Sequence, residues 1–162
     1  MRIRAILFDL DNSLFDHHTS ARAGLQGFLR HLNRKPSREL ARSWFEIEQR
    51  NYARFLAKEI SFQEQRRERL RQFLPLIGTV PPATDTQLDG ILATYLRNYE
   101  QAWVAFQDSA PTLRALCAVG LRAAVVTNGN QDQQVSKIRK IKCTSTGKVL
   151  DETARFAALP TC

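Results

Sequence analysis

Residues 3–13 have the sequence IRAILFDLDNS, and this stretch decides the fold. The mostly apolar run from Ile3 to Phe8 ends abruptly at Asp9 and is followed by a polar segment. Continuous apolarity, without strict alternation, is typical of a strand in a parallel sheet that is covered on both faces. The pattern therefore predicts a buried strand that runs directly into a polar loop.

A second stretch repeats this arrangement near residue 121. The sequence LRAAVV at 121–126 predicts a short strand, and TNGN at 127–130 predicts another polar loop. A helix is expected at 106–120, with Asp108 or Ser109 as its N-cap, and a last helix at 131–140. Because strand–helix–strand units are right-handed and parallel, both loops should lie at the same sheet edge.

The segment between these two parts is expected to be helical. Apolar residues recur at spacings of three and four between about 18 and 104, with Ser37 and Ser61 as predicted helix caps. We therefore predict an α/β fold with a Rossmann-like parallel sheet core and an inserted α-helical cap. The expected core comprises residues 1–15 and 105–162, and the expected cap comprises 16–104.

The chain of 162 residues carries a net charge of +8, which favours anionic partners such as phosphorylated metabolites or nucleic acid. Much of this charge comes from a basic helix at Arg66–Arg71 and from late lysines, among them Lys137, Lys140, Lys142 and Lys148. The three cysteines form no CxxC motif, which favours reduced thiols. No apolar run suggests a signal sequence or a membrane span, so we expect a cytoplasmic protein without a membrane partner.

The two polar loops carry residues suited to phosphate chemistry. Carboxylates at Asp9 and Asp11 can bind Mg²⁺ through oxygen, and an aspartate can attack phosphorus. A second carboxylate can protonate the leaving alcohol, while Thr127 and the backbone near Asn128 can hold phosphate oxygens. The alternative is that the aspartates are turn or cap residues, and that the second loop simply precedes a helix.

FDLDNSLFD at 8–16 and VVTNG at 125–129 resemble the first two motifs of haloacid dehalogenase-like phosphatases. The resemblance covers about residues 1–141. It implies that Asp9 is the nucleophile and a magnesium ligand, that Asp11 is the general acid/base, and that the backbone carbonyl of Asp11 joins the metal shell. Thr127 resembles the phosphate-binding residue with Asn128 beside it, and Ser13 stands where threonine is commoner. True haloacid dehalogenases lack the second aspartate, so Asp11 favours phosphate over halide chemistry.

Two further motifs of this family, a lysine before proline and a later acidic pair, have no clear counterpart after Lys140. Lys148 is the nearest lysine, but a solvated side chain is the better interpretation. Asp151 and Glu152 are the nearest acidic pair, but they resemble the start of a helix containing Phe156. We therefore expect truncation, a frameshift or alternative splicing near 141–143, leaving an incomplete sheet.

Three functions follow from these observations. The first is Mg²⁺-dependent hydrolysis of a small phosphorylated metabolite through an aspartyl-phosphate at Asp9. The second is a catalytically inactive remnant of such an enzyme. The third is a nucleic-acid-binding protein that uses the Arg66–Arg71 helix and the lysine-rich tail, which is disfavoured because no aromatic stacking pattern accompanies the charge.

Overall fold

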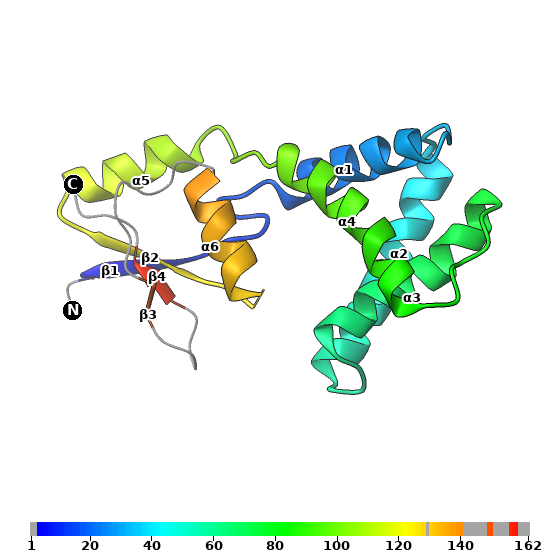
Figure 1. Ribbon diagram of the computed structural model, residues 1–162. Coiled ribbons are helices and arrows are strands. Elements are labelled where there is room, and N and C mark those ends of the chain that lie inside the picture. Colours follow the sequence, from blue (N-terminus) through cyan, green and yellow to red (C-terminus); the bar gives the residue numbers. More distant parts are fainter. Residues whose placement is uncertain (1–2, 129, 141–148, 151–155, 159–162) are drawn as a thin grey trace. The chain divides into compact units, whose positions relative to one another are not determined.

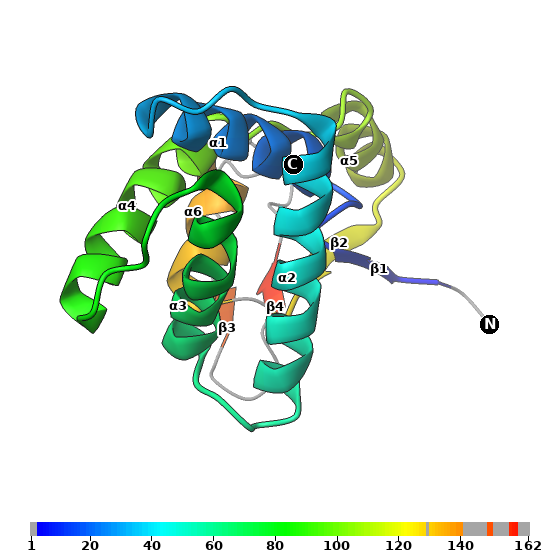
Figure 2. The same ribbon diagram turned by 90° about the vertical axis from the view of Figure 1, so that its right-hand side faces the viewer.

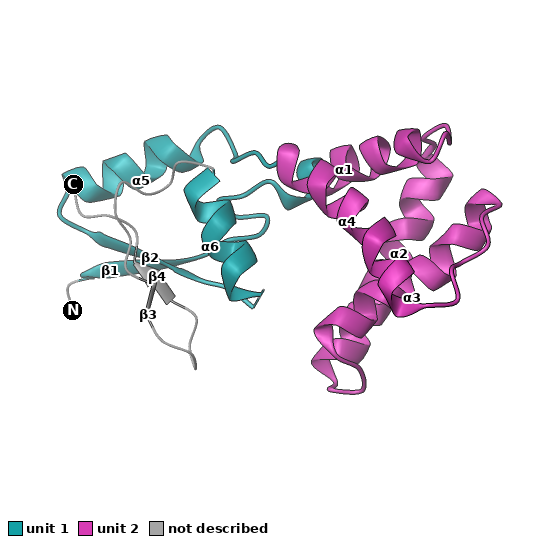
Figure 3. Cartoon of the chain, viewed as in Figure 1, with its two compact units in different colours: residues 1–20, 103–162 teal, residues 21–102 magenta. Residues whose placement is uncertain are grey.

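The computed structural model describes residues 3–128, 130–140, 149–150 and 156–158. Contacts divide the chain into two compact units, residues 1–20 with 103–162, and residues 21–102 (Figure 3). The elements in chain order (Figure 1) are β1 (Ala5–Asp9), α1 (His17–His31), α2 (Arg38–Leu56), α3 (Phe62–Phe73), the 3₁₀ helix η1 (Leu74–Ile77), α4 (Asp85–Gln101), α5 (Ser109–Ala118), β2 (Arg122–Val126), α6 (Gln131–Lys140), β3 (Val149–Leu150) and β4 (Phe156–Ala158).

The first unit has an α/β fold built on the parallel pair β1 and β2. Their register sets Ala5 opposite Arg122 and Asp9 opposite Val126, so the strands end side by side. The sheet order is β1-β2-β4-β3, and β4 is antiparallel to both of its neighbours. The predicted parallel pair is confirmed. The predicted helix containing Phe156 is wrong, because Phe156 pairs with Val126 in the sheet.

Strand β1 is less buried than its apolar sequence predicted. Leu7 is 60% exposed, and the other residues of the strand are exposed or half-buried. The reason lies in the sheet order, because among the described residues β1 is an edge strand that pairs only with β2. β1 is thus covered less completely than a central strand would be, although its sequence is mostly apolar.

The core of the first unit depends on the turn that follows β1. Its buried apolar residues include Leu10, Leu14, Phe15, Leu113, Ala123, Val125 and Ile138, which come from this turn, α5, β2 and α6. Helix α5 contacts β2. Asp108 occupies the predicted N-cap position of α5 without a side-chain capping bond, and the Ser109 hydroxyl donates to the Leu14 carbonyl.

The second unit consists of helices whose starts follow the predicted capping pattern. Ser37 and Ser61 accept hydrogen bonds from the amides of Leu40 and Glu64, at 3.2 Å and 3.1 Å. Figure 2 shows α2, α3 and α4 within this unit. Its core is rich in fully or almost fully buried rings, from Phe28, Trp44, Phe73 and Tyr95. No helix in the described part of the chain is long and apolar enough to cross a membrane.

Candidate active site

Asp9 and Thr127 lie at adjacent strand ends. Asp9 is the last residue of β1 and pairs in register with Val126, the residue before Thr127. The Asp9 side chain is exposed, and its Oδ1 accepts a hydrogen bond from the amide of Leu10 at 2.8 Å. The parallel register therefore brings the two predicted polar loops to the same edge of the sheet, where ligands bind in open α/β folds.

The turn after Asp9 is held by its own backbone. The Leu10 carbonyl accepts from the amides of Leu14 and Phe15, at 3.1 Å and 2.9 Å. Asn12 has a φ of 62°, a left-handed conformation that asparagine adopts more readily than most residues. The Leu14 carbonyl also accepts from the Ser109 hydroxyl at 2.9 Å. These contacts fix the backbone that presents Asp11.

Both carboxylate oxygens of Asp11 are engaged by helix α6. Lys137 Nζ lies 2.8 Å from Asp11 Oδ1, and Gln134 Nε2 donates to Asp11 Oδ2 at 3.0 Å. The Asp11 side chain is 31% exposed, whereas that of Lys137 is 4% exposed. The ion pair therefore joins a buried ammonium group to a carboxylate that solvent and a ligand can still reach.

Gln134 links the two loops. Its Nε2 donates to Thr127 Oγ1 at 2.7 Å as well as to Asp11, so the side chain bridges the ends of β1 and β2. Its Oε1 is buried and has no hydrogen-bond partner among the described residues. A buried acceptor without a donor costs about 1–3 kcal/mol, which favours a bound water or ligand beside it.

Lys137 is further enclosed by the turn that carries Asp11. Its Nζ lies 4.8 Å from the centroid of the Phe15 ring, and Phe15 is fully buried. A buried ammonium is tolerated where a carboxylate and an aromatic face compensate its lost hydration. The turn thus supplies both groups that stabilise Lys137.

The structure brings together three of the five predicted site residues. Asp9, Asp11 and Thr127 gather at the strand ends, the last two within one hydrogen-bonded network. Ser13 and Asn128 are exposed residues of the same two loops, and neither takes part in that network. Lys148, Asp151 and Glu152, the weaker candidates for the family's later motifs, lie outside the described residues.

The sequence interpretation missed Lys137 and Gln134 as site residues and treated Lys137 only as part of a basic region. A signal was present in the spacing. Residues 134, 137 and 138 lie on one helix face, and all three are buried. A helix that follows a sheet strand usually buries apolar residues. A glutamine and a lysine on the buried face of such a helix therefore indicate that the helix covers a polar site.

Asp9 can offer its carboxylate to a magnesium ion, and Asp11, whose carboxylate oxygens are engaged by α6, can offer its backbone carbonyl. Mg²⁺ is usually bound through one or two protein carboxylates, with water and substrate phosphate completing its shell. Within the described residues, no third histidine, cysteine, aspartate or glutamate joins these two in a metal-binding group. The unpartnered Gln134 Oε1 is consistent with a site completed by water or ligand. The donor set therefore fits Mg²⁺ with non-protein ligands.

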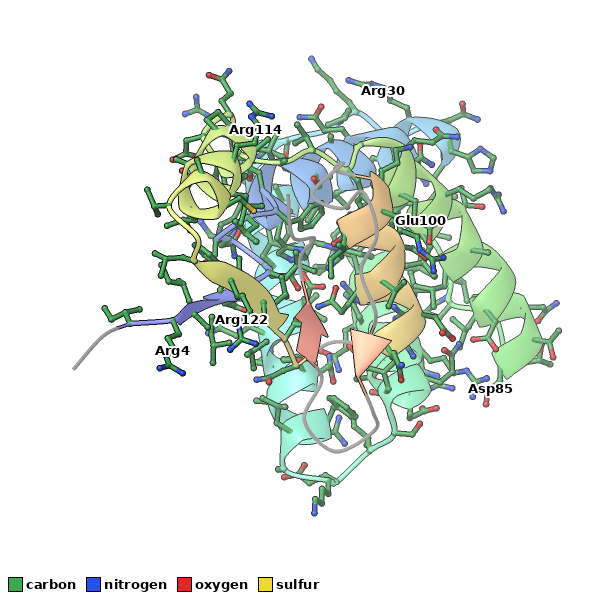
Figure 4. The ribbon with its side chains drawn as sticks, turned by 90° about the vertical axis from the view of Figure 1, so that its left-hand side faces the viewer. Arg4, Arg30, Asp85, Glu100, Arg114 and Arg122 are labelled. Atoms are coloured by element: carbon green, nitrogen blue, oxygen red, sulfur yellow. The ribbon has the colours of Figure 1, made fainter. Side chains whose placement is uncertain are left out.

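Basic residues lie at the opposite ends of the same strands. Arg4 and Arg122 are exposed and flank the starts of β1 and β2, where the Arg122 amide donates to the Arg4 carbonyl at 3.2 Å (Figure 4). Since the two strands are parallel, this end lies away from Asp9 and Thr127. The exposed positive charge of these arginines is therefore not part of the candidate site.

Comparison with known families identifies the class of protein. The model of the haloacid dehalogenase-like hydrolases matches residues 3–154, so the chain belongs to this family. The match extends past the first two motifs and includes part of the tail that those motifs left unexplained. Comparison with curated proteins gives no match.

Solved structures share the fold of this chain. The HAD-hydrolase YfnB from Bacillus subtilis, bound to magnesium, has a TM-score of 0.73 at 19% identity, with 86% of this chain and 60% of YfnB covered. The L-2-haloacid dehalogenase Rha0230 has a TM-score of 0.63 at 18% identity, covering 87% and 57%. A HAD family hydrolase from Deinococcus radiodurans, with bound phosphate and sodium, has a TM-score of 0.52 at 22% identity, covering 85% and 52%. The chain thus spans between half and two thirds of these proteins.

Proposed function

We propose that this haloacid dehalogenase-like hydrolase cleaves the phosphomonoester of a small phosphorylated metabolite through an aspartyl-phosphate at Asp9. The observation that carries the proposal is the arrangement of two aspartates at the end of β1. Asp9 is exposed, so a ligand can reach it. Asp11 lies beside Thr127 and is held at both carboxylate oxygens by Gln134 and Lys137. This arrangement separates a group that can attack from a group that is fixed for proton transfer.

The reaction proceeds in two displacements. A carboxylate oxygen of Asp9 attacks phosphorus, the bond from phosphorus to the ester oxygen breaks, and Asp11 gives its proton to the departing alcohol. Water then attacks phosphorus and gives a proton to Asp11, and the bond to Asp9 breaks to release phosphate. Asp9 and Asp11 return to their starting states, so the cycle is balanced.

We propose that Asp9 would hold Mg²⁺ through its carboxylate and Asp11 through its backbone carbonyl, and that the ion, when bound, would neutralise repulsion between the Asp9 carboxylate and a phosphate. The hydroxyl groups of Thr127 and Ser13, together with Asn128, are proposed to bind the phosphate oxygens. YfnB is described as bound to magnesium and the Deinococcus radiodurans hydrolase as bound to phosphate, and both share this fold. The 16–104 segment is proposed to act as the cap that sets substrate selectivity.

The cytoplasm is the proposed location of this reaction. Three cysteines without a CxxC motif suit a reducing compartment.

Hydrolysis of p-nitrophenyl phosphate by the purified chain, with and without Mg²⁺, tests the proposal. We expect Mg²⁺-dependent turnover that falls at least about a thousandfold in Asp9→Asn, because the nucleophile is lost. Asp132→Asn is the matched control, since Asp132 is an exposed carboxylate in the first turn of α6. An inactive wild-type chain would favour the inactive-remnant hypothesis, and an active Asp9→Asn would exclude Asp9 as nucleophile.

Dehalogenation is the competing reaction, because structural neighbours include L-2-haloacid dehalogenases. The first motif resembles that of the phosphatases because it contains Asp11, the second aspartate that true haloacid dehalogenases lack. We therefore expect no halide release from L-2-chloropropionate under conditions that support phosphate release. Halide release without phosphatase activity would reverse this assignment.

The net charge of the chain favours nucleic-acid binding, but the ion pairs of its basic helix do not. Arg67 pairs with Asp85 and Asp89 at 2.7 Å and 2.6 Å, and Arg71 pairs with Asp85 at 2.6 Å. These arginines belong to the basic helix that suggested the hypothesis, and their charge is balanced within the cap itself. Retention on a DNA column that falls steeply with salt would revive this hypothesis.

A further inference from the structure

Lys137 is a charged residue on the buried face of α6. It lies beside Ile138, and it contacts the buried Phe15 ring. Taking an ammonium group out of water is unfavourable, and replacing buried ion pairs by apolar residues is often neutral or stabilising. Because this buried pair lies with Asp11 at the carboxyl end of the parallel strands, its lysine points to a role beyond packing.

The contacts of Lys137 and Gln134 fix the orientation of Asp11. A carboxyl group turns easily about its terminal torsion, because that torsion has broad minima. Here Lys137 holds Oδ1 and Gln134 holds Oδ2, so rotation about this torsion would break two hydrogen bonds. Gln134 is itself anchored to Thr127, so Asp11 is held relative to the second loop.

We propose that Lys137 and Gln134 are positioning residues that aim the Asp11 carboxyl at the oxygen of the leaving alcohol and then at the hydrolytic water. This inference rests on the proposed phosphatase function. Neither residue transfers a proton itself. The buried Gln134 Oε1, which lacks a partner among the described residues, is the acceptor that an O–H group of the alcohol or water meets beside Asp11.

Two substrates separate positioning from general structural support. The p-nitrophenolate ion leaves readily without a proton, whereas the alkoxide of glycerol phosphate needs one as the ester bond breaks. Loss of a correctly aimed Asp11 should therefore slow the alkyl ester much more than the aryl ester. A disturbed fold or a lost phosphate site would slow both substrates alike.

The experiment compares kcat and KM for both esters in the wild-type chain, Lys137→Met and Gln134→Leu. We expect kcat for glycerol phosphate to fall about a hundredfold in Lys137→Met, within the range of general acid catalysis. For p-nitrophenyl phosphate the fall should be less than about tenfold, with KM little changed. Lys140→Met is the matched control, because Lys140 is an exposed lysine on the same helix.

Each outcome supports or overturns the inference. Circular dichroism first establishes that the variants fold, and Gln134→Leu decides the question if Lys137→Met does not fold. Equal losses for both esters would overturn the positioning role while leaving the phosphatase function intact. A wild-type chain that hydrolyses neither ester would contradict the proposed function itself, and the positioning role would fall with it.

Discussion

Two buried cations, one in each unit of the chain, have similar surroundings. Lys137 in α6 pairs with Asp11 and faces the Phe15 ring, while Arg69 in α3 pairs with Glu48 and faces the rings of Trp44 and Tyr95. Each of the two residues is 3% exposed. Burial, a carboxylate partner and aromatic contact are therefore features that the two places share.

The partners of the two cations differ in what else they can do. Glu48 belongs to α2, so the pair with Arg69 joins two helices of the second unit around an aromatic core. Asp11 belongs to the polar turn after a parallel strand and receives a second hydrogen bond from Gln134. The comparison teaches that a buried ion pair does not by itself indicate function. Its place at the carboxyl end of the strands does.

The largest effect is expected from removing the aromatic ring on which Arg69 lies. Trp44 is fully buried and contacts the rings of Phe28, Phe73 and Tyr95, so Trp44→Ala leaves a cavity that these side chains fill poorly. We expect a loss of about 3–5 kcal/mol in the free energy of unfolding, measured with urea by circular dichroism. Leu56→Ala, which removes a side chain that is 58% exposed at the end of the same helix, is the control. A similar loss in both variants would contradict the assigned core.

Breaking the Arg69 pair should be the next most damaging change. Arg69→Met leaves Glu48 without its partner, but the Glu48 side chain is 25% exposed and is partly rehydrated. We expect a loss of about 2–3 kcal/mol in unfolding free energy, at or below the range for broken buried pairs. The double variant Arg69→Met/Glu48→Leu should recover much of this loss. A double variant as unstable as the single one would show that the ion pair is not the cause.

Lys137→Met should change stability least among the core substitutions, even though it is expected to alter catalysis. Asp11 keeps its hydrogen bond from Gln134, and its 31% exposure lets water replace the ammonium group. We expect a change within about 1 kcal/mol in the free energy of unfolding, in either direction, as for partly exposed ion pairs. A loss as large as that of Arg69→Met would make Lys137 a structural residue and remove the distinction between the two cations.

Local sequence patterns predicted the elements that position the site. Helix α6 begins and ends at the predicted residues 131 and 140, because its own periodicity and polar boundaries define it. The predicted strands β1 and β2 pair in parallel, as expected for a strand–helix–strand unit. The segment at Phe156 was assigned wrongly, since a few apolar residues suit either a helix or a strand. Its pairing with β2 decided the conformation.

The ion pair within the site illustrates what a local pattern does not contain. Asp11 and Lys137 are 126 positions apart, and each has an ordinary local explanation as a turn residue or a basic surface residue. Their contact depends on the parallel register that places the β1 turn beneath α6. The two aspartates were predicted from a motif. The spacing of Gln134 and Lys137 could have indicated a polar helix face, but their contacts with Asp11 are seen only in the tertiary structure.

The smallest effect is expected at an ion pair of the second unit, between Arg67 and Asp89, whose side chains are half-buried. Hydrogen bonds from Arg67, and then from Gln63, lower the pKa of Asp89 from 3.8 to about 2. Asp85 and Glu64 also face Arg67, whose pKa is raised mainly by its hydrogen bond to Asp89. Figure 4 labels Asp85 at the start of α4, the helix that also carries Asp89.

A lowered carboxyl pKa stabilises the folded state at pH values above the ordinary value of 3.8. This contribution is lost as the pH falls from about 4 towards 2, because the unfolded chain takes up the proton first. Asp89→Asn should therefore unfold less steeply with acid in that window and differ little from the wild-type chain in its pH dependence above pH 5. Urea unfolding between pH 2.5 and 7 measures this difference, and exposure and salt screening should make it the smallest of the four. Parallel acid profiles for the two proteins would show that Arg67 does not hold Asp89 in solution as it does in the structure.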